Sequence, residues 1–238
     1  MSPLAGDASF RRYFRVSHQG ETFVLMDAPP EKENVASFLD IRRWLEAVGV
    51  RVPHLVAADR TRGFLLLEDF GDVTWATYLE GHPDPSSLLE DAFRQLGCLQ
   101  SHAPGSGLAV FNEARMRAEC DLYPDWYLPH VAVYEPSVKE RRVFHDALAP
   151  VFKTIAALPR VPVHLDYHSR NLMLPEDGLP LGVIDFQDAV MGPVTYDAAS
   201  LLYDCYQDYP EAMCREWSSR FFAGLPHDLC SFFSGFDD

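Results

Sequence analysis

Residues 163–189, VHLDYHSRNLMLPEDGLPLGVIDFQDA, constrain the fold of this chain more than any other stretch. An apolar run leads into Asp166, two strand-like runs (LML and LGVID) flank the turn residues 175–178, and Asp185 ends the second run. The turn sequence Pro-Glu-Asp-Gly is typical of a connection between antiparallel strands. The pattern predicts a small hairpin that follows the loop containing Asp166 and ends at Asp185.

The spacing of polar residues in this stretch has a chemical meaning. Asp166 precedes Asn171 by the interval of a kinase catalytic loop, Asp-x-x-x-x-Asn, and Asp185 stands where such proteins carry a second metal-binding carboxylate. Phosphoryl transfer needs a carboxylate near the acceptor hydroxyl and hard oxygen ligands for Mg²⁺. The stretch therefore predicts a phosphoryl-transfer site.

A simpler interpretation exists for each residue taken alone. Asp and Asn are common in turns, so Asp166 and Asn171 can cap turns and Asp185 can end a strand. The apolar run before each acidic residue and the fixed interval together favour the catalytic interpretation. We expect His164 to brace the loop and His168 to be an exposed loop histidine.

The chain changes character after its first third. FRRYFRVS and ETFVLMDA, joined by residues 18–20, and HLVAAD and FLLLED, joined by residues 59–63, predict two strand pairs. Apolar residues at helical spacing predict helices over residues 35–48, 88–99 and 138–157, with Gly49 as a C-cap. We expect an α+β fold with a small β-rich N-terminal lobe (residues 1–70) and a larger helical C-terminal lobe (residues 71–238).

Composition limits the possible partners. A formal net charge of -15 disfavours sequence-independent binding to nucleic acid or to an anionic membrane, since both attract basic surfaces. The five cysteines form no CxxC pair, which fits reduced thiols. The amino terminus lacks the apolar core of a signal peptide, and no apolar run reaches membrane-spanning length. We expect a cytoplasmic protein; the sequence does not predict its oligomeric state.

Several stretches resemble a known group. HLDYHSRN, IDFQDA and YDAASLLYD resemble the aminoglycoside phosphotransferase and choline kinase superfamily, which has a two-lobed protein-kinase-like fold. GDASFRRYFRV, VLMDAPPEKENVASFLDI and LLLEDFGD are similar, more narrowly, to the cell-wall amino-sugar kinases. Those enzymes phosphorylate N-acetylmuramate and N-acetylglucosamine at the anomeric hydroxyl in peptidoglycan recycling. The resemblance implies an ATP- and Mg²⁺-dependent kinase of a small hydroxyl-bearing metabolite, foremost an amino sugar.

The resemblance also implies roles for individual residues. It makes Asp166 the catalytic base and makes Asn171 and Asp185 the magnesium ligands. It makes LLLEDF the hinge that meets adenine through backbone groups near Glu68 and Phe70. It further implies that Asp197, in YDAASL, is a buried acid that supports the catalytic loop.

The phosphate-covering segment departs from the usual kinase pattern. GDASFRRYF lacks GxGxxG, so backbone groups around Ser9 and the charge of Arg12 or a neighbouring arginine are expected to contact the phosphates. A solvated strand face is the alternative for each arginine. Met26 stands near the position of the usual phosphate-binding lysine. This leaves open a nucleotide-binding pseudokinase without catalysis.

The acceptor pocket is the least constrained part of the sequence. Asp188 is a candidate for hydrogen bonding a sugar hydroxyl, and Arg170 is a candidate for meeting the lactyl carboxylate of N-acetylmuramate. We expect the aromatic rings of DLYPDWYLPH (121–130) to lie in the core. The acidic composition suits choline or an aminoglycoside equally well, so a choline-type or aminoglycoside-type kinase is the alternative.

Overall fold

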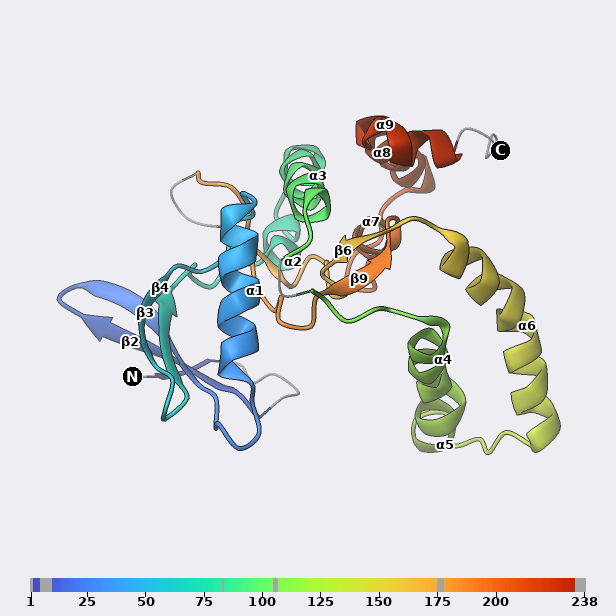
Figure 1. Cartoon of the computed structure of the whole chain (residues 1–238), viewed down its shortest axis with the longest axis horizontal. Helices are drawn as coiled ribbons and strands as arrows, with labels where there is room; N and C mark the ends of the chain where they lie inside the picture. Colours follow the sequence, from blue (N-terminus) through green and yellow to red (C-terminus); the bar gives the residue numbers. More distant parts are fainter. Residues whose placement is uncertain (1, 5–9, 83, 105–106, 175–177, 234–238) are drawn as a thin grey trace.

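The structure is a computed structural model that describes residues 2–4, 10–82, 84–104, 107–174 and 178–233. The first part of the chain forms an antiparallel sheet, seen on the left of Figure 1. Its described strands lie in the order β1-β2-β3-β5-β4. They are β1 (Ser2–Pro3), β2 (Arg12–His18), β3 (Glu21–Asp27), β4 (Leu55–Asp59) and β5 (Phe64–Glu68).

Both predicted strand pairs are confirmed. β2 and β3 pair from Arg12 opposite Asp27 to His18 opposite Glu21. Gln19 and Gly20 turn the chain with φ angles of 53° and 87°, the left-handed values that a two-residue hairpin requires at both positions. β4 and β5 form the second pair.

Helix α1 (Val35–Ala47) lies across one face of the sheet (Figure 1). The Asn34 side chain accepts a hydrogen bond from the Ser37 N–H at 3.1 Å and so caps the first turn. Gly49, with a φ of 90°, follows the last turn in the conformation expected of a C-cap glycine. The predicted helix is confirmed, and its apolar side packs into the same core as Met26 and Leu65 of the sheet.

The remainder of the chain is mainly helical. Its helices are α2 (Trp75–Leu79), α3 (Ser86–Ser101), α4 (Glu113–Leu122), the π-helix η1 (Tyr123–Tyr127), α5 (Leu128–His130), α6 (Val138–Ala157), α7 (Tyr196–Leu202), α8 (Glu211–Gly224), α9 (His227–Cys230) and the 3₁₀ helix η2 (Ser231–Phe233). The predicted helices at α3 and α6 are confirmed. None of the helices in the described part of the chain is both long and apolar enough to cross a membrane.

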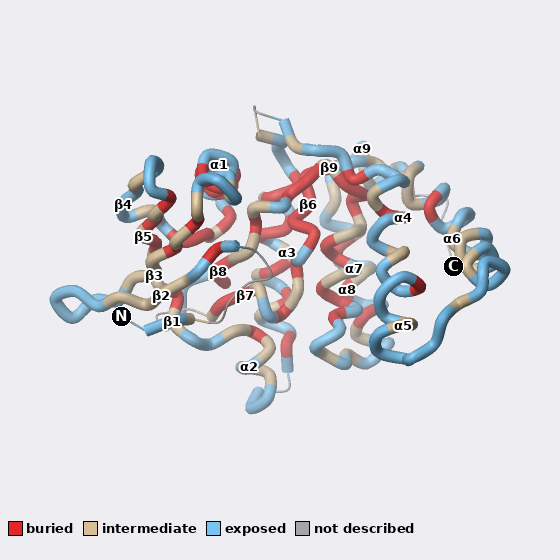
Figure 2. Tube along the Cα trace, turned by 90° about the horizontal axis from the view of Figure 1, so that it is seen from below, coloured by how far each residue is buried: buried red, intermediate tan, exposed pale blue. Residues whose placement is uncertain are grey.

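Two small antiparallel sheets lie between α6 and α7. β6 (Arg160–Val163) pairs with β9 (Val190–Pro193), and β7 (Leu172–Met173) pairs with β8 (Gly182–Val183). The β7–β8 pair is the hairpin predicted from the sequence. Figure 2 shows buried chain concentrated where α3, β6, β9 and α7 meet. The loop between β6 and β7 therefore extends from a rigid centre.

Helices α4, α5 and α6 lie at the end of the molecule opposite the sheet (Figure 1). The sequence-based expectation that the aromatic residues of DLYPDWYLPH are core residues is wrong. The exposed fractions are 49% for Tyr123, 57% for Trp126 and 45% for Tyr127. The π-helix η1 carries these rings on the outer surface of the helices α4 to α6.

Candidate active site

The loop that carries Asp166 is fixed by hydrogen bonds to a buried carboxylate. Asp197, at the start of α7, accepts hydrogen bonds from the backbone N–H groups of His164 (2.7 Å) and Leu165 (3.1 Å). Leu165 has a φ of 77°, a strained value for a branched side chain that persists only where the surroundings enforce it. Burial raises the pKa of Asp197 to about 7, although both N–H donors favour its ionised form. The expected supporting role of Asp197 is confirmed.

His164 joins this loop to the strand that precedes Asp185. The fully buried imidazole contacts the Ile184 carbonyl through Nε2 (3.0 Å) and accepts the Asp166 N–H at Nδ1 (3.2 Å). The two contacts require a neutral ring with the proton on Nε2. Burial lowers the pKa of His164 to about 4, although the hydrogen bond to Ile184 opposes this shift. His164 braces the loop, as predicted.

Asn171 forms a second link between the same two segments. Its side-chain Nδ2 donates to the Asp166 backbone carbonyl at 3.0 Å, and the backbone carbonyl of Asn171 accepts the Ile184 N–H at 3.0 Å. The side-chain amide therefore uses its nitrogen within the loop and has its oxygen available as a ligand. Asp185 follows Ile184 directly and has a φ of 62°, so the backbone turns sharply at this residue.

The outer side of the loop packs on the segment after α7. The Asp204 carboxylate accepts the N–H groups of Ser169 and Tyr206, both at 2.8 Å. The Arg170 guanidinium lies 3.8 Å from the centre of the Tyr206 ring, and His168 meets the same ring edge-on at 5.2 Å. His168 is half-buried, not exposed as predicted, because Tyr206 covers it.

A cavity of about 440 Å³ opens between the sheet and the helical part of the chain. Four of the predicted site residues line it: Glu68, Phe70, Asn171 and Asp185. Asp166, exposed on its loop, does not line this cavity. Arg12 and Arg170 are also outside its lining, and Ser9 lies outside the described residues.

The linker after β5 forms the back of this cavity. The Glu68 carboxylate accepts hydrogen bonds from the Arg51 guanidinium (2.8 Å) and the His54 N–H (3.1 Å), and the Glu68 N–H donates to the His54 carbonyl. Glu68 is thus occupied by the segment that precedes β4. Phe70 packs so closely on Gly182 that a Cβ on that glycine would stand 2.3 Å from its ring. The β7–β8 hairpin therefore supports the linker directly.

The position usually held by a lysine is apolar. Met26 is fully buried in the core, on the same side of β3 as Val24, which lines the cavity. Phe38 of α1 and Phe186 pack together at 5.0 Å between ring centres and also line the cavity. Helix α1 and Met26 of the sheet share one hydrophobic core, where kinases often have an ion pair.

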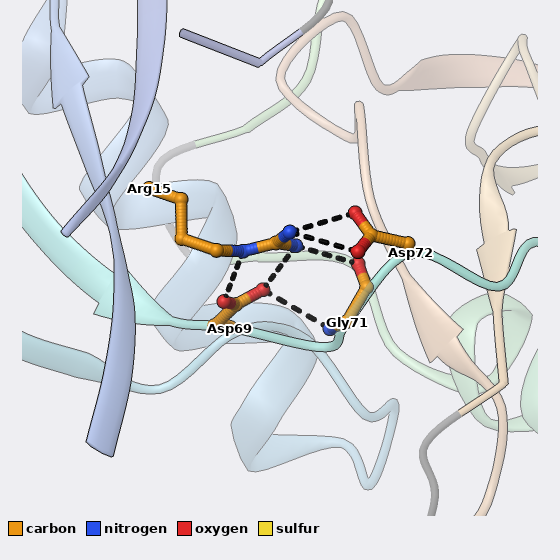
Figure 3. Close-up of polar contacts among 4 residues, drawn as sticks. All are labelled: Arg15, Asp69, Gly71 and Asp72. Carbon is orange, nitrogen blue, oxygen red and sulfur yellow. Dashed lines mark hydrogen bonds and ion pairs between the residues drawn. The ribbon is translucent and has the colours of Figure 1, made fainter. Parts of the chain in front are cut away.

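Arg15 is the only cation among the described residues that line the cavity. Its guanidinium binds the carboxylate of Asp69, the carboxylate of Asp72 and the carbonyl of Gly71 (Figure 3). Arg12 alternates with Arg15 on β2, points to the other face of the strand, is largely exposed and pairs with Asp27. The sequence identified an arginine on this strand but did not identify which one borders the cavity.

The donor set suits magnesium. Among the described residues no group of three His, Cys, Asp or Glu side chains is placed to bind a metal. Asn171 and Asp185 instead supply two hard oxygen ligands at one wall of the cavity, and Mg²⁺ typically takes one or two such ligands together with substrate phosphates and water. Four carboxylates against one guanidinium leave the lining negative, so an anionic ligand requires a bound cation.

Comparison with known proteins decides the family. The phosphotransferase enzyme family matches residues 1–233. The chain belongs to the phosphotransferase enzyme family. This phosphotransferase is 40% identical over 234 residues to the N-acetylmuramate/N-acetylglucosamine kinase of Pseudomonas aeruginosa, covering 94% of the chain and 67% of that protein. It is 36% identical over 231 residues to the enzyme of the same name from Neisseria meningitidis, covering 93% and 68%.

Alignment with solved structures identifies the fold of this phosphotransferase. It aligns with a choline kinase from Streptococcus pneumoniae at a TM-score of 0.67 and 12% identity, covering 98% of the chain and 81% of that structure. It aligns with the ADP-bound aminoglycoside phosphotransferase APH(2'')-Ib at a TM-score of 0.58 and 16% identity, covering 97% and 80%. The predicted two-lobed, protein-kinase-like α+β fold is confirmed.

Proposed function

We propose that this phosphotransferase is an ATP- and Mg²⁺-dependent kinase that phosphorylates N-acetylmuramate and N-acetylglucosamine at the anomeric hydroxyl. The observation that carries the proposal is the 40% identity, over 94% of the chain, to a kinase named for these two sugars. In this proposal residues 1–70 form the nucleotide-binding lobe, and residues 71–238 carry the catalytic loop and the acceptor site.

The nucleotide would occupy the cavity between the two lobes. Because the Glu68 N–H is used by His54, a backbone donor for the base comes from Asp69 or Phe70. Val24, Met173 and Ile184 supply apolar walls for a flat ring. The segment around Ser9 remains a candidate for contacting the phosphates, whereas Arg12 points away from the cavity.

The reacting end would lie where the catalytic loop meets Asp185. Asn171 and Asp185 would hold Mg²⁺, which, when bound, neutralises charge on the phosphate oxygens. Asp166 would orient the acceptor hydroxyl and take its proton. His164 keeps the Asp166 backbone in place by accepting its N–H, and Asn171 does so by donating to its carbonyl.

A coupled ADP-release assay tests the proposal. The chain is incubated with ATP and Mg²⁺ together with N-acetylmuramate, N-acetylglucosamine, choline or kanamycin. We expect turnover with both amino sugars and none with choline or kanamycin. Turnover with choline or kanamycin alone would establish the alternative acceptor class, and nucleotide binding without turnover of any acceptor would establish a pseudokinase.

A further inference from the structure

A second cavity, of about 460 Å³, lies next to the first. Its polar wall residues are Asn34, Ser37, Asp40, Arg115, Gln187 and Asp188. Gln187 lines both cavities and is therefore part of the partition between them. A space of this size fits a small ligand, and its polar wall suits a hydroxyl-rich one.

Gln187 connects the proposed metal ligand to this second cavity. Its Nε2 donates to Asp185 Oδ1 at 2.7 Å and contacts Asp188 Oδ2 at 3.2 Å. Its Oε1 is buried and has no hydrogen-bond partner among the described residues. Because a buried oxygen is usually paired, Oε1 is an unsatisfied acceptor in the partition between the two cavities.

Arg115 is the only cation among the described residues that line the second cavity. It extends from α4, pairs with Glu119 at 3.3 Å and is 38% exposed. Its guanidinium lies 5.6 Å from the centre of the Phe111 ring, and Phe111 meets Tyr196 edge-on at 5.1 Å.

Tyr196 relates this arginine to the catalytic loop. Burial raises the pKa of the Tyr196 hydroxyl to about 12; the charges of Glu119, Asp197 and Asp166 contribute to this rise, and the charge of Arg115 opposes it. Asp166, on the reacting loop, and Arg115, in the wall of the second cavity, therefore both lie close enough to Tyr196 to influence it.

We propose that the second cavity holds the acceptor sugar and that Arg115 binds the lactyl carboxylate, which N-acetylmuramate carries and N-acetylglucosamine lacks. This inference rests on the proposed function. Asp40 and Asp188 repel a carboxylate in the same cavity, so its binding requires a nearby cation. A guanidinium binds a carboxylate through two parallel hydrogen bonds. Arg170, the sequence-based candidate, stacks on Tyr206 and lines neither cavity.

The test compares two arginines of the same helix. Arg117 is 36% exposed and pairs with Glu113 at 3.4 Å, but it lies over Phe152 and outside the second cavity. The kcat/KM for each sugar is measured at saturating ATP in the unsubstituted chain and in Arg115→Ala, Arg115→Lys and Arg117→Ala. We expect the ratio of N-acetylmuramate to N-acetylglucosamine to fall by roughly tenfold or more in Arg115→Ala and to stay unchanged in Arg117→Ala.

Arg115→Lys keeps a positive charge but not the two-bond geometry, so we expect an intermediate ratio. The inference is overturned if the ratio in Arg115→Ala equals that of the unsubstituted chain, or if Arg170→Ala alone reproduces the fall. Thermal unfolding shows whether each variant is folded. If Arg115→Ala is unfolded, the ratio measured in Arg115→Lys tests the inference instead. A chain that phosphorylates neither sugar overturns the proposed function as well, whereas turnover of both sugars with an unchanged ratio overturns this inference alone.

Discussion

The Arg15 guanidinium and the Asp69 carboxylate form a two-bond ion pair, with Nε to Oδ2 at 2.5 Å and Nη2 to Oδ1 at 2.9 Å. Arg15 belongs to β2, and Asp69 belongs to the linker that follows β5. The Asp69 side chain is only 3% exposed. The pair therefore attaches β2 to the linker at the back of the cavity proposed for the nucleotide.

Replacing Arg15 with methionine should weaken both stability and nucleotide binding. The change leaves a buried carboxylate without its partner, which costs about 3 kcal/mol for a buried pair. Arg12→Met is the matched control on the same strand, because the Arg12 side chain is 66% exposed and its pair with Asp27 should contribute less than about 1 kcal/mol. Urea unfolding and nucleotide titration measure the two effects; equal losses in both variants would refute the role given to Arg15.

The contribution of His164 to stability should fall as the pH is lowered from 6.5 to 4, whereas the raised pKa of Asp197 acts in the opposite direction. Burial lowers the pKa of His164 to about 4, so the unfolded chain binds a proton in this window that the folded chain does not. A difference of this size corresponds to about 3 kcal/mol. Protonation at Nδ1 also removes the acceptor of the Asp166 N–H, so activity should fall together with stability.

Unfolding free energies in urea between pH 7.5 and 4.5 check this prediction. The variant His164→Asn should be less stable at neutral pH and should lose this part of the pH dependence. The exposed His18 provides the control substitution, His18→Gln, which should keep the full dependence. An unaltered pH profile in His164→Asn would exclude His164 as its source.

Asp166→Ala and Asp185→Ala should separate proton transfer from nucleotide binding. Asp166 lies outside the lining of the nucleotide cavity, so its loss should reduce kcat by about 10² to 10⁴ and leave the affinity for Mg²⁺ and nucleotide nearly unchanged. Asp185 lines the cavity, so its loss should also weaken Mg²⁺-dependent nucleotide binding. Calorimetric titration with and without Mg²⁺ distinguishes the two; retained turnover in Asp166→Ala would remove the proposed base.

Gly182→Ala should displace the linker. The added methyl group would stand 2.3 Å from the Phe70 ring, so either the ring or the β7–β8 hairpin must move. We expect a loss of about 1 to 3 kcal/mol in unfolding free energy, as for other overpacked sites, and a weaker affinity for nucleotide. Gly97→Ala, in the open middle of α3, is the matched control and should stabilise the chain by roughly 0.5–1 kcal/mol. Equal thermal shifts in both variants would contradict the close packing of Phe70.

Much of the fold follows from local signals. Turns and helix caps depend on the backbone conformation and side chains of neighbouring residues. They mark the ends of elements at the Gln19-Gly20 turn, the Asn34 N-cap and the Gly49 C-cap. The interval from Asp166 to Asn171 similarly specifies a loop, since the link between the Asn171 side chain and the Asp166 carbonyl closes over five positions. Such features depend on only a few consecutive residues, so they can be recognised from the sequence.

Sequence patterns alone predict the pairs β2–β3 and β4–β5, the β7–β8 hairpin, helices α1, α3 and α6, and the catalytic-loop motif. The packed structure is needed to see that Arg15 and not Arg12 borders the cavity proposed for the nucleotide, that Asp69 is its partner, and that Arg115 of α4 shares a wall with Asp188. These relationships join residues far apart in the chain, and adjacent strand residues such as Arg12 and Arg15 look alike until the register fixes which face each occupies. Local pattern specifies an element, whereas packing between elements selects the side chains that meet in a cavity.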